Sequence, residues 1–440
     1  MTAALQALDA QRLSPRQRYA AVLVAFGEFI DGYDLLVMGA ALIIIRSRFG
    51  LSPGEVGLLG ASTFLGAIVG LLVFGDLSDR FGRRAIFVIN LAFFVVFALT
   101  SAFVDNVWEL FAARILVGVG VGMDIPTSTA YLAEIAPRNQ RGAVLGSLLN
   151  VMWVLGAMTS TLLALPLMAL FGDDAWRWMF GLGAVPAFLV LLARRGLPES
   201  PRWLISRGRN EEAAAALAQF GIEGAVAPRP EGRGSYGELL RPPWRGRVAW
   251  VSLVFFLNCF AGSISTIATP LVFKTVGAFS NTATLLASAS VWITALAGPA
   301  VSAVLVDRIG RRTLALISTI PFGLTALALA LFGQAHPVVL VGGFYLLSFS
   351  VWMGIGVLVW VWGSELFPTR LRGRSQGVCN GWCRLAIASN IFVAPIALST
   401  VGFSVYVGLL ALPMFAIAII VWRVDLFEIT GHELEALELS

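Results

Sequence analysis

Long apolar stretches, broken by short polar clusters, run along almost the whole 440-residue chain. A helix that crosses a membrane needs roughly 20 apolar residues, and the pattern contains about twelve such stretches. They predict membrane-spanning helices at 18–45, 56–78, 84–104, 108–135, 141–168, 177–195, 247–274, 281–306, 312–334, 338–366, 373–400 and 403–424. We therefore expect an all-α membrane protein of twelve transmembrane helices.

The composition agrees with this reading, because 58% of the residues are hydrophobic and only 13% are charged. Soluble proteins carry about 25% charged residues, whereas a surface that faces lipid needs none. The first apolar stretch follows a polar tail with Arg12, Arg16 and Arg18. No cleavable signal pattern precedes it, so we expect this stretch to be a retained helix. Three cysteines and two histidines are too scattered for a disulfide framework or a metal site, and we expect no cofactor.

The arginines indicate how the chain is oriented. They gather in alternate loops: the N-terminal tail, Arg80, Arg83 and Arg84, Arg138 and Arg141, the segment 194–247, Arg308, Arg311 and Arg312, and Arg370, Arg372 and Arg374. Positive charge marks cytoplasmic loops, so both termini should be cytoplasmic. This placement accounts for the net charge of +5 without a nucleic-acid partner. We expect a monomer in a bacterial inner membrane, with the lipid bilayer, a small-molecule substrate and protons as its partners.

The predicted spans divide into two sets of six. We expect an N-terminal bundle at 1–195, a cytoplasmic linker at 196–246, a C-terminal bundle at 247–425 and a cytoplasmic tail at 426–440. The linker is rich in proline and glycine and therefore largely irregular. Its part from Asn210 to Phe220, with an alanine run, should form a short helix.

Two short patterns occur once in each half. The run Asp79-Arg80-Phe81-Gly82-Arg83-Arg84 returns as Asp307-Arg308-Ile309-Gly310-Arg311-Arg312, and Glu134-x-x-Pro137-x-x-x-Arg141 returns as Glu365-x-x-Pro368-x-x-x-Arg372. Matching positions point to a duplicated six-helix unit, and transporters place the substrate between such repeats. We expect ion pairs among these residues to close a cytoplasmic gate in one state; alternatively, each positive loop only anchors the topology.

These motifs resemble those of a known family. Gly75-Asp76-Leu77-Ser78-Asp79-Arg80-Phe81-Gly82-Arg83-Arg84 looks like the major facilitator signature between helices two and three. Pro198-Glu199-Ser200-Pro201-Arg202-Trp203-Leu204 resembles the sugar-porter motif after helix six, and Phe427-Glu428-Ile429-Thr430-Gly431 resembles a degenerate form of that family's C-terminal motif. The resemblance implies the major facilitator fold, with two pseudo-symmetric six-helix bundles, and proton-driven or facilitated transport of small solutes.

Charged residues inside a membrane are costly and mark function by default. Asp31 and Asp34 lie three apart in the first span and share one face. Arg114 opens the fourth span and is a candidate partner of Asp34; sugar porters are similar in carrying Gly-Tyr-Asp and an arginine at these places. We predict that Asp34, and with it Asp31, carries the transported proton. For Asp124, substrate binding and a satisfied packing role remain open.

Arg384 lies in the middle of the eleventh span. A buried guanidinium needs an anion, which is either an aspartate of the protein (Asp31, Asp34 or Asp124) or a substrate carboxylate, which the planar fork of arginine fits. Where sugar porters have a glutamine pair, this chain has Leu257-Asn258. Cys383-Arg384-Leu385-Ala386, followed by Pro395, looks like organic-anion and nicotinate transporters, and the paired aspartates resemble aromatic acid/proton symporters.

Aromatic and small polar residues complete the predicted substrate pocket. They are Tyr33, Asn150, Trp153, Asn258, Ser263, Trp360, Asn380 and Trp382. Aromatic rings can stack on a flat ring or a sugar face. For each of them, a packing or lipid-facing role is the alternative.

Three functions follow from these observations. The first is a proton-coupled symporter that imports a small organic anion, such as an aromatic or heterocyclic carboxylate like nicotinate, by alternating access. The second is a proton-coupled sugar or polyol porter. The third is a membrane sensor or an enzyme. The sequence contains no soluble signalling domain to support a sensor, and no nucleophile–base pair or metal cluster to support an enzyme. Arg384 favours the first function over the second.

Overall fold

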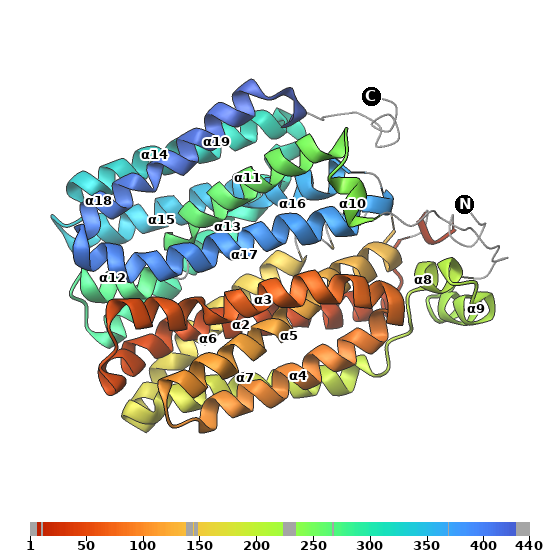
Figure 1. The fold of residues 1–440 in the computed structure, drawn as a ribbon, viewed down its shortest axis with the longest axis horizontal. Helices are drawn as coiled ribbons and strands as arrows, with labels where there is room; N and C mark the ends of the chain where they lie inside the picture. The colour runs from red at the N-terminus through yellow and green to blue at the C-terminus, as the bar shows by residue number, and fades with distance from the viewer. Residues whose placement is uncertain are drawn as a thin grey trace.

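The computed structural model describes residues 7–9, 12–137, 144, 148–222, 235–265, 268–367 and 369–427. Two helical bundles lie side by side in Figure 1. One bundle is built from α2 (Pro15–Phe49), α3 (Pro53–Phe81), α4 (Arg83–Phe103), α5 (Val107–Ile135), α6 (Leu149–Phe171) and α7 (Ala175–Arg194). The other is built from α11 (Trp244–Gly262), α12 (Thr269–Thr275), α13 (Asn281–Ile309), α14 (Arg311–Phe332), α15 (Pro337–Met353), α16 (Ile355–Glu365), α17 (Thr369–Thr400), α18 (Gly402–Leu409) and α19 (Ala411–Arg423).

Within the described residues, ten stretches are long and apolar enough to cross a membrane. One of them, Leu149–Arg194, holds both α6 and α7, and α2 is not among the ten. Helix α2 is long enough, but Glu28, Asp31 and Asp34 place three charges in its middle. With α2 included and α6 separated from α7, the described chain has the twelve spans predicted from the sequence, which confirms the fold class.

Three of the predicted spans are interrupted. The seventh consists of α11, a 3-10 turn at Ser263–Ser265 and α12. The tenth breaks at Gly354 between α15 and α16, and the twelfth divides at Leu410 between α18 and α19. No charged residue accompanies any of these breaks, so the charge clusters that bound the other spans do not show them.

The segment between the bundles contains three short helices. They are α8 (Pro201–Ser206), α9 (Asn210–Gln219) and α10 (Tyr236–Leu239). The predicted helix at Asn210–Phe220 is therefore present, one residue shorter. In Figure 1 these helices lie at the end of the molecule where α2 begins and α19 ends. We call this the linker end and the other the far end.

The repeated glycines show the duplication in the backbone. Gly82 ends α3 and precedes α4 with φ 96° and ψ 160°, while Gly310 ends α13 and precedes α14 with φ 81° and ψ 161°. Only glycine adopts such a positive φ at little cost. The two copies of the sequence pattern thus make the same sharp connection between consecutive spans.

The fourth span, which carries Gly118, Gly120 and Gly122, packs closely on the second. A Cβ atom at Gly118 would overlap the carbonyl oxygen of Thr63, and one at Gly122 would overlap the carbonyl oxygen of Ala67. Gly120 has more room, with its nearest neighbours 3.6 Å away. Two of the three glycines therefore allow α5 to lie directly against α3.

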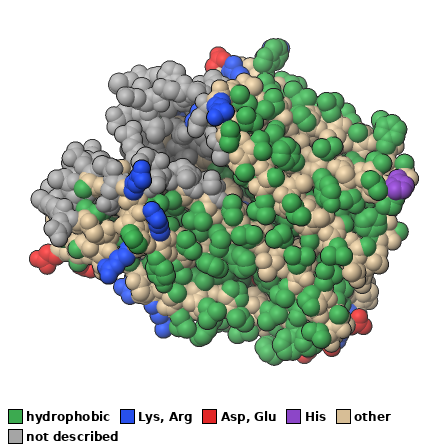
Figure 2. Space-filling view, turned by 180° about the vertical axis from the view of Figure 1, so that it is seen from behind, with side chains coloured by type: hydrophobic (Ala, Val, Ile, Leu, Met, Phe, Trp, Pro, Cys, Tyr) green, Lys and Arg blue, Asp and Glu red, His purple; other side chains and the backbone are tan. Residues whose placement is uncertain are grey.

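The exterior is that of a protein in lipid. Figure 2 shows hydrophobic side chains over most of one face, with Lys and Arg gathered toward the linker end. Each bundle also has its own buried core, and the aromatic side chains Trp153, Trp292 and Trp352 join the two cores. The described chain is thus a multi-pass membrane protein.

Candidate functional site

A cavity of about 150 Å³ lies between the two bundles. Among the residues that line it are six predicted from the sequence: Asn150, Trp153, Asn258, Ser263, Trp360 and Arg384. They come from α6, α11, the 3-10 turn after α11, α16 and α17. Two of the three interrupted spans, the seventh and the tenth, therefore contribute to the cavity. Transporters use such discontinuous helices to bind their substrates.

Tryptophans form one wall of this cavity and connect the bundles. The ring of Trp153 on α6 lies 5.8 Å from that of Trp292 on α13 and 5.9 Å from that of Trp352 on α15. Among the described residues, the indole N–H groups of Trp153 and Trp352 have no hydrogen-bond partner, and neither has the side-chain oxygen of Asn258. Buried polar groups are normally paired, so these donors and this acceptor are suited to a ligand.

A second cavity, about 340 Å³, lies toward the far end. Its lining is mainly apolar, with Arg46 and Lys274 as the cationic side chains. No residue predicted for the substrate site lines this cavity within the described chain. We therefore place the candidate site in the smaller cavity, although it has less room.

The pair Asp34 and Arg114 predicted from the sequence is present. Arg114 Nη1 donates to Asp34 Oδ1 at 3.0 Å, and Nη2 donates both to Asp34 Oδ2 and, at 2.9 Å, to the Asp34 carbonyl oxygen. Neither side chain has any exposed surface. The guanidinium also lies over the Phe180 ring at 4.6 Å. Tyr33, predicted for the substrate site, belongs to this region, and its hydroxyl donates to the Met179 carbonyl at 2.8 Å.

Asp124 belongs to a different network, and its partner is Arg194. Arg194 Nη1 donates to Asp124 Oδ1 at 2.7 Å, and the Asn90 amide donates to the same oxygen at 2.6 Å. Ser128 donates to the other carboxylate oxygen at 2.8 Å. These contacts tie α4, α5 and α7 together. Asp124 thus has partners for both carboxylate oxygens and does not line the central cavity.

Arg384 has none of the aspartate partners considered for it. Asp34 is taken by Arg114 and Asp124 by Arg194, and among the described residues Arg384 forms no ion pair with Asp31. Its guanidinium lies 5.9 Å from the Phe64 ring, and it lines the cavity. Glu28, which the sequence analysis missed, lines the same cavity. The sequence contained a sufficient signal for Glu28, because it is a carboxylate one turn before Asp31 in an apolar helix.

Two further predicted residues lie outside the cavity. Trp382 is 46% exposed on the outer surface, where its ring meets Phe256. It faces away from the bundle interface and cannot form a wall beside Arg384. Asn380 is buried, and its amide donates to the Gln376 carbonyl at 2.9 Å. Trp382, two residues before Arg384, projects from another side of α17, whereas Asn380, one turn before Arg384, shares its side of the helix but does not line the cavity.

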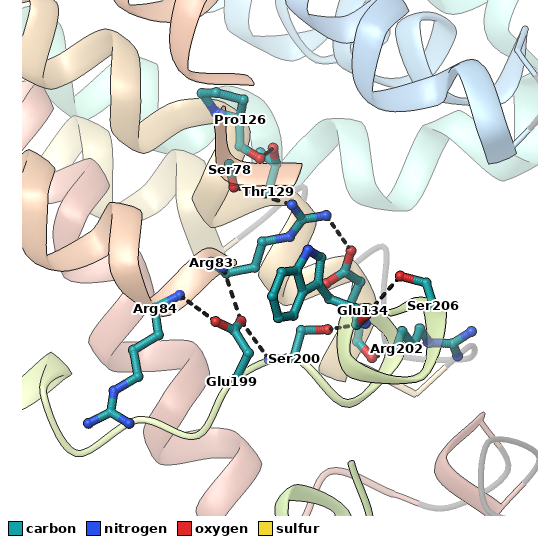
Figure 3. Close-up of polar contacts among 11 residues, drawn as sticks. Ser78, Arg83, Arg84, Pro126, Thr129, Glu134, Glu199, Ser200, Arg202 and Ser206 are labelled. Carbon is teal, nitrogen blue, oxygen red and sulfur yellow. Dashed lines mark hydrogen bonds and ion pairs between the residues drawn. The ribbon is translucent and has the colours of Figure 1, made fainter. Parts of the chain in front are cut away.

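The first copy of the predicted gate contains an ion pair at the linker end (Figure 3). Arg83 Nη2 lies 2.9 Å from Glu134 Oε1 and joins α4 to α5. Glu199, which was not among the predicted gate residues, accepts from the backbone N–H groups of Arg83 and Arg84 at 3.0 and 3.1 Å. A carboxylate at the start of α4 also complements the helix dipole. Arg202 adds a contact to the Glu134 carbonyl at 3.2 Å.

For most of the other predicted gate residues, the structure does not describe the side chain or shows it exposed. Arg141 lies outside the described residues, and so do the side chains of Asp79, Asp307, Glu365 and Arg372. Arg80 and Arg308 are exposed at the ends of α3 and α13. Arg311 begins α14. Its neighbour Arg312 pairs with Asp425 at 3.0 Å. The described side chains thus show the gate contact of the first repeat.

Comparison with known proteins identifies relatives of this chain among membrane transporters. The chain matches the family described as sugar (and other) transporter over residues 20–439. It is 30% identical to a putative metabolite transport protein, YwtG, of Bacillus subtilis over 94% of this chain and 93% of the relative. It is 29% identical to a D-xylose transporter of Levilactobacillus brevis over 94% of each. These relatives are transporters, which agrees with the expectation that the chain is not an enzyme.

Solved structures give the same fold. The proton:xylose symporter XylE, bound to 6-bromo-6-deoxy-D-glucose, superposes with a TM-score of 0.78 at 26% identity, over 95% of this chain and 98% of that one. The comparisons support the resemblance to sugar porters and give no support to the resemblance to organic-anion and nicotinate transporters. The chain belongs to the sugar (and other) transporter family, and its fold is that of the major facilitator superfamily.

Proposed function

We propose that this protein is a proton-coupled symporter that imports a small hydroxylated solute, a sugar or a polyol, by alternating access. The observation that carries the proposal is the fully buried pair of Asp34 and Arg114. The names of similar proteins, among them an arabinose-proton symporter of Bacillus subtilis, support the choice of solute and coupling ion. Here Asp34 binds the transported proton and Arg114 senses whether it is bound.

Burial makes this pair suitable for coupling. With both groups ionised, the attraction offsets the large cost of removing two charges from water. Protonation of Asp34 cancels one charge and leaves the Arg114 guanidinium without its anion. The helices α2 and α5 then gain from a rearrangement that gives Arg114 other acceptors. Proton binding and a change of helix packing are thus linked within one contact.

The cavity provides groups for a hydroxylated solute. Asn258 offers an acceptor and Trp153 a donor, each without a partner in the described chain. Trp360 adds an aromatic face at the same cavity. Aromatic faces stack on the C–H face of a sugar ring while polar groups bind its hydroxyls.

The test separates proton coupling from substrate binding. In proteoliposomes, Asp34→Asn should abolish uptake driven by a pH gradient and leave counterflow exchange of the same solute largely intact. Equal loss of both activities would show that Asp34 binds substrate or only supports the fold. Asp124→Asn, which changes a buried carboxylate outside the cavity, is the matched control and should reduce both activities together.

A second substrate class, the small organic anion, rests on Arg384, whose guanidinium lines the cavity and forms no ion pair among the described residues. A thermal-shift panel of carboxylates and neutral sugars on the purified protein distinguishes the classes, because a ligand stabilises the state that binds it.

We further propose that the chain divides into its two bundles, linker and tail at 195/196, 246/247 and 425/426, and that both termini are cytoplasmic. We also propose a gate at the linker end that opens as the Arg83–Glu134 pair separates. Cysteine labelling of a Gly208→Cys variant tests the orientation.

A further inference from the structure

Two opposite charges face the central cavity from different bundles. Glu28 projects from α2 in the first bundle and Arg384 from α17 in the second. Only 9% of Glu28 and 7% of Arg384 is exposed. Both side chains are thus more than nine-tenths buried in a region that lipid surrounds, and their charges need compensation there.

The protein does not supply that compensation within the described chain. Glu28 and Arg384 form no ion pair with each other at the usual limit of 4.0 Å, and neither has a hydrogen bond in the described residues. The Nε atom of Arg384 is buried without a partner among the described residues, and its guanidinium lies 5.9 Å from the Phe64 ring. Arg384 therefore presents an unused binding surface to the cavity.

The other buried charges are committed elsewhere. Arg114 holds Asp34, and Arg194 holds Asp124. The charged groups around Glu28 are Asp31, three residues later on α2 itself, and, from neighbouring helices, Asp124 on α5, Arg194 on α7 and Arg384 on α17. Two of these are carboxylates and two are guanidinium groups, but the Asp124 and Arg194 charges largely cancel each other. The state of Glu28 therefore depends chiefly on Arg384 and on what binds to Arg384, with Asp31 as the neighbouring carboxylate on its own helix.

A ligand carboxylate satisfies Arg384 best. The guanidinium presents parallel N–H groups that match the two oxygens of a carboxylate. Such a ligand brings a second negative charge into the cavity beside Glu28. Two carboxylates that share a low-dielectric site cannot both stay ionised, so one of them takes up a proton.

We propose that the cavity binds a sugar acid, with its carboxylate on Arg384, and that Glu28 takes up a proton as the acid binds. This inference rests on the proposed function and makes its substrate more specific. The hydroxyl groups of the acid meet Asn258 and Trp153, as those of a neutral sugar would. The proton comes from solvent through the cavity and leaves by the same route after the acid dissociates. No bond other than that to the proton forms or breaks.

The experiment measures binding and proton uptake on the purified full-length chain. Calorimetric titrations with D-glucuronate, D-galacturonate and D-gluconate, each beside its neutral amide, are repeated in buffers with different ionisation enthalpies. At least one acid should bind roughly tenfold to a hundredfold more tightly than its amide, as expected for hydrogen bonds to a charged group. The dependence on buffer should give about one proton taken up per acid bound.

Two variants assign the groups. Glu28→Gln should bind the same acid with little or no proton uptake, and its affinity should change less with pH. Arg384→Gln should lose the preference for the acid over its amide. Asp34→Asn is the control for the other proton site and should keep the uptake on binding. A thermal unfolding curve of each variant checks that it is folded.

The proposal is overturned if none of the three acids binds more tightly than its amide. It is also overturned if Glu28→Gln takes up the same proton as the native protein. A neutral sugar that drives proton uptake while the acids do not bind would contradict this inference but keep the proposed function. Acid binding without any proton-driven transport would contradict the proposed function instead.

Discussion

Asp34 and Glu28 lie less than two helical turns apart on α2, yet their carboxylates are in opposite situations. Asp34 has a guanidinium partner from the same bundle, at 3.0 Å, and no exposed surface. Glu28 faces a guanidinium from the other bundle across a cavity and does not reach it. The protein completes the first site itself and leaves the second for a ligand.

This difference separates two tasks. The Asp34–Arg114 pair joins two helices of one bundle, and neither residue lines the cavity. A pair divided between bundles responds to whatever enters the cavity between them, and each alternating-access movement changes its geometry. Another buried ion pair, Arg194 with Asp124, has hydrogen bonds from Asn90 and Ser128 and resembles the completed site.

The strongest test of the comparison is to remove each guanidinium. Arg114→Leu leaves the buried Asp34 carboxylate without a partner and should destabilise the protein by about 3–5 kcal/mol. The matched change Arg384→Leu removes a cation that has no carboxylate partner among the described residues, so stability should change little or improve. Thermal unfolding in detergent measures both. Similar losses would mean that Arg384 has an internal anion and that the two sites do not differ.

A double-mutant cycle sharpens the comparison for Asp124. The changes Asp124→Asn and Arg194→Gln should show a coupling of about 0.5–3 kcal/mol, as for residues in direct contact. The same cycle with Arg384→Gln in place of Arg194→Gln should show almost none. Unfolding free energies in a reversible denaturing detergent give both values. Strong coupling between Asp124 and Arg384 would return Asp124 to the substrate site.

The sequence was sufficient for the fold because apolar length is a strong and local signal. Most predicted spans, such as 281–306 against Asn281–Ile309, begin within a few residues of the observed helices. The breaks after Gly262 and at Gly354 were not predicted, since apolar residues continue on both sides. These breaks lie at the cavity. Hydropathy therefore does not predict the backbone conformation where it depends on packing between the bundles.

The site was predicted only in part, because the sequence gives the place of a residue along the chain but not the direction in which its side chain points. Arg194 was read as part of the positive linker, yet its long side chain turns back into the bundle to reach Asp124. Glu199 stands in a recognised motif, but its contact with the start of α4 depends on the path of the chain after α7. The same limit applies to Trp382, which shares a helix with Arg384 and faces outward.

A smaller effect tests whether the open site is the substrate site. Trp360→Ala removes an aromatic face from the cavity and should weaken substrate binding by roughly twofold to tenfold, the range for aromatic contacts. Trp382→Ala changes the same residue type on the outer surface and should leave binding unchanged. Equilibrium binding of the transported solute compares the two. A larger loss in Trp382→Ala would place the substrate away from this cavity.

The smallest expected effect concerns a carboxylate at the far end that has neither a guanidinium partner nor burial. Glu55 accepts from the Ser52 hydroxyl at 2.7 Å and from its backbone N–H at 2.9 Å, which caps the start of α3. The Ser52 side chain lowers the pKa of Glu55 below its usual value of 4.5. A lowered pKa in the folded state means that the ionised cap adds stability above pH 4.5, and that this stability is lost as the pH falls through the folded-state pKa.

The cap of α2 uses Gln17 with Ser14 in the same arrangement and has no charge to lose. Glu55→Gln should therefore reproduce a neutral cap, so the small difference in unfolding temperature between it and the native protein should be present at pH 6 and vanish toward pH 3. Gln17→Ala should lower the unfolding temperature equally at both pH values. A Glu55→Gln variant that is more stable than the native protein at pH 6 would show instead that the ionised carboxylate destabilises the folded protein.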